Sequence, residues 1–287
     1  MLCRKLASAE LDVALVSSFE FFRNPIYAIV DGISISSGGP VYSVFVAHRG
    51  SISEIEEIEL DPASETSVNL LRCLLAAHRV SPRLVVRDGV EKRAQREVLG
   101  SAESCPERSR TRCRPAVAGG LPATADDVLP SEELIDTSRQ VAETGRLAAR
   151  APQTSLSSDA AQLFIGDQAI RFRQAHGHEF EYWDLGAEWK KIVDLPFVYA
   201  LWLIRPEVSD AKAIADRLRA LRDGNLANLD ELIAAEEDFD HEFCKVYYGE
   251  NLRFHFGEKE KEGLRAFQKL CVKHSLLPES EIEFVVV

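Results

Sequence analysis

The chain has 287 residues, of which 46% are hydrophobic, and it carries a formal net charge of −12. This length and apolar content predict a globular protein with a sizeable core. The acidic balance argues against a nucleic-acid partner, because binding to phosphate backbones needs a clustered positive field. No segment approaches the roughly 18 uninterrupted apolar residues of a membrane span, and the first residues lack a signal-peptide core. Six cysteines without metal-ligand spacing favour reduced thiols, so we expect a cytoplasmic protein with no membrane contact.

In the first third of the chain, strands and helices follow one another. The residue pattern predicts the tail of an amphipathic helix that leads directly into a buried strand at Val13–Val16. Two further strands are expected at Val41–Ala47 and Ile55–Leu60, followed by a helix from Ser67 to His78. From about residue 91 to 154, Arg, Pro, Gly and Ser mix with little periodicity, which indicates a disordered insertion.

Beyond this insertion the apolar pattern returns. A short buried strand is expected to stop at Gly166 and Asp167, and a short helix over residues 184–192 precedes a long apolar strand at Phe197–Ile204. The remainder is predicted to be helical, over residues 209–224, 229–239, 240–250 and 259–277. This alternation predicts an α/β fold. The strands Val41–Ala47 and Phe197–Ile204 flank the middle segment as crossings would, which favours two lobes joined by a two-stranded hinge, with a ligand between them.

The stretch "ISISSGGPVYSVFV" (residues 33–46) places a shaped loop between two strand-like runs. Gly38 and Gly39 supply conformational freedom, whereas Pro40 fixes φ and removes a donor. One interpretation is an ordinary connection between strands, since Gly and Pro interrupt loops everywhere. The other is the wall of a substrate cleft.

Two further turns carry polar groups at the ends of strands. Ser64, Thr66 and Ser67 stand where a helix begins, so they could form a cradle for a carboxylate or phosphate, or they could only cap the helix. Gly166 and Asp167 also follow a strand end, where ligands gather in open α/β sheets.

The remaining chemical motifs favour structural interpretations. His176 and His178 could suggest a metal, but no third ligand has a fixed spacing, so an exposed loop is expected. His241 lies in a charged run typical of a solvated helix face, and Trp189 and Trp202 are expected in the structural framework. No G-x-S-x-G elbow, P-loop or G-x-G-x-x-G motif occurs in the sequence.

Several stretches taken together resemble the chorismate dehydratase family, whose members catalyse the first step of the futalosine route to menaquinone. In chain order they are "LDVALVSSFEFF", "ISSGGPVYSV", "ASETSVNLLRCLL", "DAAQLFIGDQAI", "WDLGAEWKKIVDLPFVYALWLIR" and "ENLRFHFGEKEKEGL". They cover nearly everything except the start and residues 91–154. The resemblance implies a two-lobed fold like type-II periplasmic solute-binding proteins, with residues 1–43 and 200–287 in one lobe and 44–199 in the other. It further implies dehydration of chorismate to 3-[(1-carboxyvinyl)oxy]benzoate, with no metal or organic cofactor.

The resemblance also implies roles for particular residues. The serine of the family's G-P-V-x-S motif matches Ser43, so we expect Ser43 to be catalytic and to hydrogen-bond near the leaving hydroxyl. Ser37 and Gly39 are then expected to shape the loop against the substrate ring. The remaining expected substrate contacts are Ser64, Thr66 and Ser67 for a carboxylate, and Gly166 and Asp167 for the cleft wall. No side chain is an obvious base, and we hypothesise that a substrate carboxylate accepts the proton.

The chain departs from the family at two places. Family members begin with a strand that carries a Y/F-L-N motif with an active-site asparagine, and nothing before Met1 matches it, so we expect lobe 1 to be truncated. The insertion is also foreign to the family. A start codon assigned too late and a degraded gene both remain open. So do a non-catalytic carboxylate-binding protein of the same fold and, as a third choice, 1,4-dihydroxy-6-naphthoate synthase. A transcription-factor effector domain would share the fold, but no helix-turn-helix precedes it.

Overall fold

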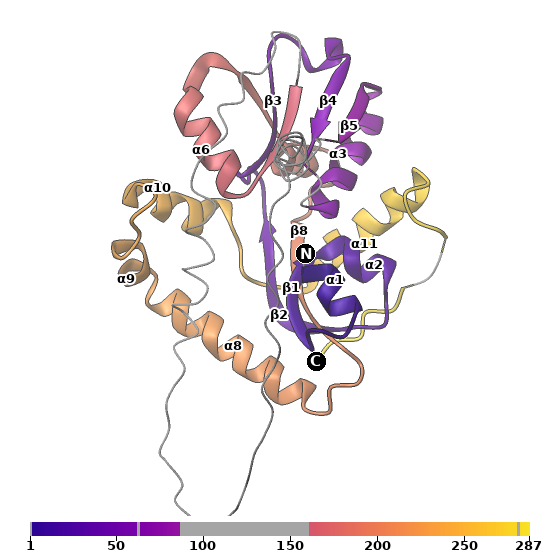
Figure 1. The fold of residues 1–287 in the computed structure, drawn as a ribbon, viewed down its shortest axis with the longest axis vertical. Coiled ribbons are helices and arrows are strands. Elements are labelled where there is room, and N and C mark those ends of the chain that lie inside the picture. Colours follow the sequence, from indigo (N-terminus) through magenta and orange to yellow (C-terminus); the bar gives the residue numbers. More distant parts are fainter. Residues whose placement is uncertain (1, 62–63, 87–160, 280–281) are drawn as a thin grey trace, which may run out of the picture. The chain divides into compact units, whose positions relative to one another are not determined.

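The structure, a computed structural model, describes residues 2–61, 64–86, 161–279 and 282–287 (Figure 1). Its first sheet has three antiparallel strands in the order β1-β8-β2. They are β1 (Val13–Ser17), β8 (Phe197–Ile204) and β2 (Ala28–Ser37). The central strand is β8, and six of its eight residues are buried, as expected for an apolar run with a neighbour on each side.

The second sheet has five strands in the order β5-β4-β6-β3-β7. They are β5 (Arg83–Val86), β4 (Glu57–Leu60), β6 (Ala161–Ile165), β3 (Val44–His48) and β7 (Glu181–Asp184). β3 pairs antiparallel with β6 and β7, whereas β4 pairs parallel with β5 and β6. All five residues of β3 are buried. The predicted α/β class is therefore confirmed as a mixed α/β fold with two sheets.

The chain passes between the two sheets at two places among the described residues. It leaves β2 at Ser37 and enters β3 at Val44, and it later leaves β7 and helix α7 (Leu185–Val193) to enter β8 at Phe197. The first passage is the Gly- and Pro-containing loop that the sequence singled out.

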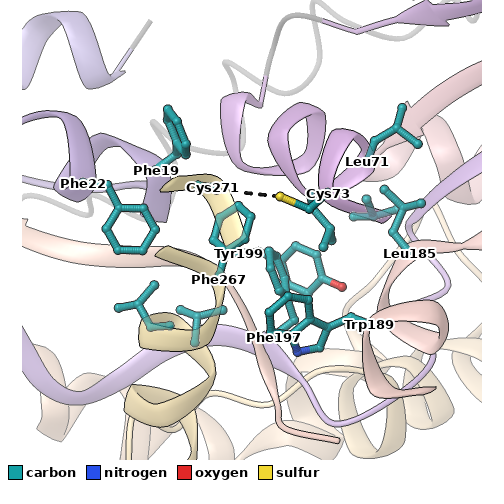
Figure 2. Close-up of a cluster of buried hydrophobic side chains, with 14 of the residues drawn as sticks. Phe19, Phe22, Leu71, Cys73, Leu185, Trp189, Phe197, Tyr199, Phe267 and Cys271 are labelled. Atoms are coloured by element: carbon teal, nitrogen blue, oxygen red, sulfur yellow. Dashed lines mark hydrogen bonds between the residues drawn. The ribbon is translucent and has the colours of Figure 1, made fainter. Parts of the chain in front are cut away.

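A hydrophobic cluster packs helices against both passages and both sheets. Helices α2 (Ser18–Arg23), α3 (Glu65–His78) and α11 (Glu258–Lys273) contribute to this cluster, together with α7 and β8. Figure 2 shows Phe267 among the rings of Phe22, Phe197 and Trp189, with centroid distances of 5.8, 4.9 and 6.1 Å. Nearby, the thiols of Cys73 and Cys271 lie 3.9 Å apart. Trp189 is buried in this cluster, as predicted.

The helices expected after β8 are present. They are α8 (Ala211–Ala227), α9 (Leu229–Ala234), α10 (His241–Val246) and a π-helical turn over Tyr247–Asn251, followed by α11. Helix α8 packs along β2 (Figure 1). The short opening helix α1 (Leu2–Ala7) precedes β1, as the pattern predicted.

One region differs from the expectation. Helix α6 (Asp167–His176) follows β6, a 3-10 turn spans Gly177–Glu179, and the segment expected to be an exposed loop continues as β7. Within the segment expected to be a loop, Phe180 and Trp183 are buried, because β7 pairs with β3 and needs an apolar face. The predicted insertion at about 91–154 lies outside the described residues. In the described part of the chain, no helix combines the length and hydropathy of a membrane span.

Candidate functional site

The loop between β2 and β3 is anchored by one carboxylate. Asp184, the last residue of β7, accepts the backbone N–H of Tyr42 at 2.8 Å and of Val41 at 3.1 Å, and it also caps helix α7 by accepting the N–H of Ala187 at 2.9 Å. Tyr42 has a φ of 66°, a left-handed conformation that is unfavourable for a residue with a side chain. The charged acceptor therefore stabilises a turn that the loop sequence alone does not favour.

A segment from the C-terminal part of the chain runs beside this loop. Arg253 and Ser36 exchange two backbone hydrogen bonds of 2.8 and 2.9 Å. Further along, the amide of Asn251 donates to the carbonyl of Pro40 at 3.0 Å, and the hydroxyl of Tyr247 donates to Ser43 Oγ at 2.8 Å. We call residues 36–43 the serine loop and residues 247–253 the facing segment. Together they form the candidate site.

Ser43, the predicted catalytic residue, is 4% exposed and ends the serine loop. Its carbonyl accepts the N–H of Gly166 at 2.8 Å, so the structure brings these two predicted residues into contact. Gly166 has a φ of 67°, a conformation that suits glycine, and it precedes Asp167 at the start of α6. The negative charge of Asp167 is a minor contributor to the raised pKa of Tyr247, which burial lifts to about 12.

Ser37 and Gly39 lie at the other end of the same loop. The Ser37 hydroxyl donates to the carbonyl of Gly39 at 3.0 Å and lies 3.3 Å from the hydroxyl of Tyr199. Burial raises the pKa of Tyr199 far above its ordinary value. A side chain on Gly186 would overlap the Gly39 carbonyl and lie 2.9 Å from both hydroxyls, so this glycine lets α7 approach the loop closely.

The three hydroxyl residues at the start of α3 form a separate group. Ser64 is the N-cap, and its Oγ accepts the N–H of Ser67 at 3.3 Å. The side chain of Thr66 is fully buried, and its Oγ1 accepts the N–H of Phe19 at 3.0 Å and lies against the hydroxyl of Ser17. The capping interpretation is therefore correct for Ser64. The roles of Ser64, Thr66 and Ser67 in carboxylate binding stay predictions.

Strand β8 connects this hydroxyl group with the serine loop. Ser18 donates to the carbonyl of Val198 at 2.7 Å, and the next residue, Tyr199, carries the hydroxyl near Ser37. Thr66 lies 3.2 Å from the same Ser18 hydroxyl. The structure thus places the predicted residues in two groups, one at the serine loop and one at the start of α3, linked through neighbouring positions of β8.

Arg253, which the sequence analysis did not single out, lies with its cationic side chain on the serine loop. The guanidinium of Arg253 lies against Gly38 so closely that a Cβ there would be 2.6 Å from Nη2. Among the described residues, no hydrogen bond or ion pair engages this guanidinium. Arg253, Tyr247 and Asp184 were all missed because nothing in their local sequence reveals a contact with a loop that is distant in the chain.

Two hollows on the described surface lie elsewhere. One of about 440 Å³ is lined by residues that include His48, Ser51, Glu181 and Trp183, and one of about 330 Å³ lies beside α3, at Glu65 and Arg72. Neither contains a residue of the serine loop. Burial lowers the pKa of His48, and its Nδ1 contacts the carbonyl of Gly50 at 3.1 Å.

Two sheets and a hydroxyl-rich loop at a passage between them define a mixed α/β protein with a polar candidate site. The sequence matches the menaquinone biosynthesis family over residues 1–103 and 135–273. The chain belongs to this family.

Individual relatives agree with this assignment. The chain is 27% identical over 267 residues to the chorismate dehydratase of Thermus thermophilus, in an alignment that covers 92% of this chain and 81% of that protein. A crystal structure of an Archaeoglobus fulgidus protein is similar at a TM-score of 0.55 and 17% identity, covering 96% of this chain and 84% of the other. An ABC transporter structure from Parabacteroides distasonis is similar at 0.53 and 10% identity, covering 100% and 84%. The two structural similarities concern the fold alone.

Proposed function

We propose that the chain is a hydro-lyase that converts chorismate into 3-[(1-carboxyvinyl)oxy]benzoate and water. The observation that carries this proposal is the similarity to a chorismate dehydratase along 92% of the chain. The serine expected from the family motif is buried at the end of a loop held on both sides. The proposed substrate is a small dicarboxylate, the proposed location is the cytoplasm, and no metal or organic cofactor is needed.

The proposed architecture has two lobes of the type-II periplasmic-binding-protein kind. Residues 1–43 and 200–287 would form one lobe and residues 44–199 the other, with the ligand between them. The two passages of the chain between the sheets support this arrangement, because a two-stranded hinge needs two such passages. The serine loop is one of these passages.

The proposed chemistry is an elimination that aromatises the ring. The C–O bond to the ring hydroxyl breaks, a neighbouring carbon loses its proton, and the hydroxyl leaves as water. Aromatisation supplies much of the driving force, so the protein mainly has to position the ring and manage protons. In this proposal Ser43 hydrogen-bonds to the leaving hydroxyl, and Ser37 and Gly39 shape the loop against the ring.

The two substrate carboxylates need donors. The proposal assigns one carboxylate to Ser64, Thr66 and Ser67 at the N-terminus of α3, where the helix dipole favours negative charge. The Arg253 guanidinium, exposed beside Gly38, suits the other, because a carboxylate accepts from two of its N–H groups. Gly166 and Asp167 would form the adjacent wall.

A second candidate is a carboxylate-binding protein of the same fold without catalysis. Protein groups hold the hydroxyls of Ser37, Ser43 and Ser64 in place, which supports a preformed binding surface. The two functions separate in one experiment, in which the purified chain is incubated with chorismate and the benzoate product is followed by chromatography. Product above a no-enzyme control supports the hydro-lyase. Saturable chorismate binding by calorimetry without product would establish the binding protein instead.

A further inference from the structure

The hydroxyls of Ser37 and Ser43 differ in whether they donate their hydrogen to a described residue. The Ser37 hydroxyl donates its hydrogen to the carbonyl of Gly39. Ser43 instead accepts a hydrogen from Tyr247 at 2.8 Å, and no described residue accepts the Ser43 hydrogen in return. The Ser43 side chain is nevertheless almost fully buried. A buried hydroxyl whose hydrogen has no acceptor is unusual unless a ligand accepts that hydrogen.

Tyr247 is held firmly enough to impose this direction. Its ring is stacked on Phe243, with centroids 5.5 Å apart and planes inclined by 15°. Its carbonyl accepts the N–H of Leu252 at 3.0 Å within the π-helical turn that it begins. Phe243 also packs on Tyr42 of the serine loop, with centroids 5.0 Å apart. The phenol and the serine are thus positioned by the same packed group.

We propose that Tyr247 is a positioning residue for the dehydration, which donates its phenolic hydrogen to Ser43 and so directs the serine hydrogen toward the leaving hydroxyl of the substrate. This inference rests on the proposed function. The two hydroxyls form a donor chain from Tyr247 through Ser43 to the substrate oxygen, and such chains strengthen each bond along them. The leaving oxygen takes up the proton that the ring loses, so water forms and both hydroxyls end the cycle unchanged.

The inference predicts that Tyr247 acts only through Ser43. Tyr247→Phe keeps the ring and its stacking but removes the donor, so kcat should fall by about tenfold, as for the loss of one hydrogen bond. KM should stay within about twofold, because substrate binding uses other groups. Tyr182→Phe is the matched control, because Tyr182 lies outside the candidate site and its hydroxyl has no hydrogen-bond partner among the described residues, so both constants should stay unchanged.

The test is a double-mutant cycle of wild type, Tyr247→Phe, Ser43→Ala and the double variant, with thermal unfolding recorded for each protein. In the Ser43→Ala background, Tyr247→Phe should change neither residual turnover nor the calorimetric Kd for chorismate by more than about twofold. Full kcat in Tyr247→Phe, or effects of the two substitutions that multiply, would overturn the inference while leaving the proposed function intact. A folded wild type that does not convert chorismate would overturn the proposed function, and this inference with it.

Discussion

The carboxylate of Asp184 accepts the backbone N–H of Tyr42 at 2.8 Å, across 142 residues of chain. This bond holds a tyrosine in the left-handed region directly before Ser43. One acidic side chain at the end of β7 therefore fixes the conformation of the serine loop and the start of helix α7 together.

Asp184→Ala should weaken both elements. The substitution removes the hydrogen bonds to a charged acceptor and the N-cap of α7. Together these losses should decrease the free energy of unfolding by about 2–4 kcal/mol. Urea unfolding measures this directly. Asp194→Asn serves as control: this residue at the other end of α7 is 86% exposed, and Asn tolerates its left-handed φ of 58°, so the effect should be much smaller. Equal effects of the two substitutions would contradict the anchoring role of Asp184.

Gly186→Ala should disturb the serine loop without altering any polar group. The new methyl group would overlap the carbonyl of Gly39, so the loop or α7 must shift, at a cost of about 1–3 kcal/mol. We expect lower chorismate turnover as well, since Ser37 lies in the displaced segment. Gly224→Ala meets nothing within 4 Å inside helix α8 and should instead be stabilising by up to about 1 kcal/mol. Thermal unfolding of the two variants measures this difference. Similar changes in Tm for Gly186→Ala and Gly224→Ala would refute the argument that Gly186 is needed for close approach.

Arg253→Gln should impair substrate binding. The guanidinium beside Gly38 is proposed to bind a carboxylate, so its loss should raise KM for chorismate by about tenfold, with a smaller change in kcat. Lys212→Gln removes a surface charge that is paired with Asp216 on α8 and should leave KM unchanged. Steady-state kinetics at two ionic strengths distinguish a local contact from general electrostatic attraction.

His48 makes stability depend on pH. Burial lowers its pKa, so the folded state disfavours the charged imidazole. The free energy of unfolding should therefore decrease as pH falls below about 6.5, where the unfolded chain binds the proton more readily. The part of this decrease due to His48 should disappear in His48→Gln. Identical pH profiles of the two proteins in urea unfolding between pH 8 and about pH 5 would show that this group does not contribute.

Phe267 should be among the most costly residues to truncate. It is fully buried and its ring contacts four other aromatic rings in the cluster of Figure 2, Phe19, Phe22, Trp189 and Phe197. Phe267→Ala should lower the free energy of unfolding by about 3–5 kcal/mol. Lys269→Ala, exposed on the same helix, should change it by less than about 0.5 kcal/mol. A small effect of Phe267→Ala would mean that the cluster repacks.

The elements with strong local patterns could be predicted from the sequence. The uniformly apolar run Phe197–Ile204 is the central strand β8, and the helical spacing of leucines in residues 67–78 belongs to α3. Helix α6 was missed because its residues are mostly polar and carry only a thin apolar face. Phe172 of this helix packs against Phe164 of β6, with ring centroids 4.1 Å apart, a contact that the local pattern does not predict.

The site could be predicted only in part for a similar reason. The serine loop is visible as a Gly- and Pro-rich stretch, and Ser43 lies at its end. The partner of Ser43 is 204 residues away, in a segment that reads as an ordinary helix end. Asp184 likewise reads as a helix cap, and its second role appears only when β7 pairs with β3. Contacts between distant segments are set by tertiary packing, so their side chains carry no local signal.

The most direct test of the central claim, that chorismate is dehydrated at Ser43, compares the wild-type chain with Ser43→Ala and Ser53→Ala by chromatography of the benzoate product. Ser53 is an exposed serine outside the candidate site and controls for handling. We predict product from the wild type and from Ser53→Ala, and a loss of at least about 100-fold in kcat for folded Ser43→Ala. Undiminished turnover by Ser43→Ala, or no product from a folded wild type, would contradict the account.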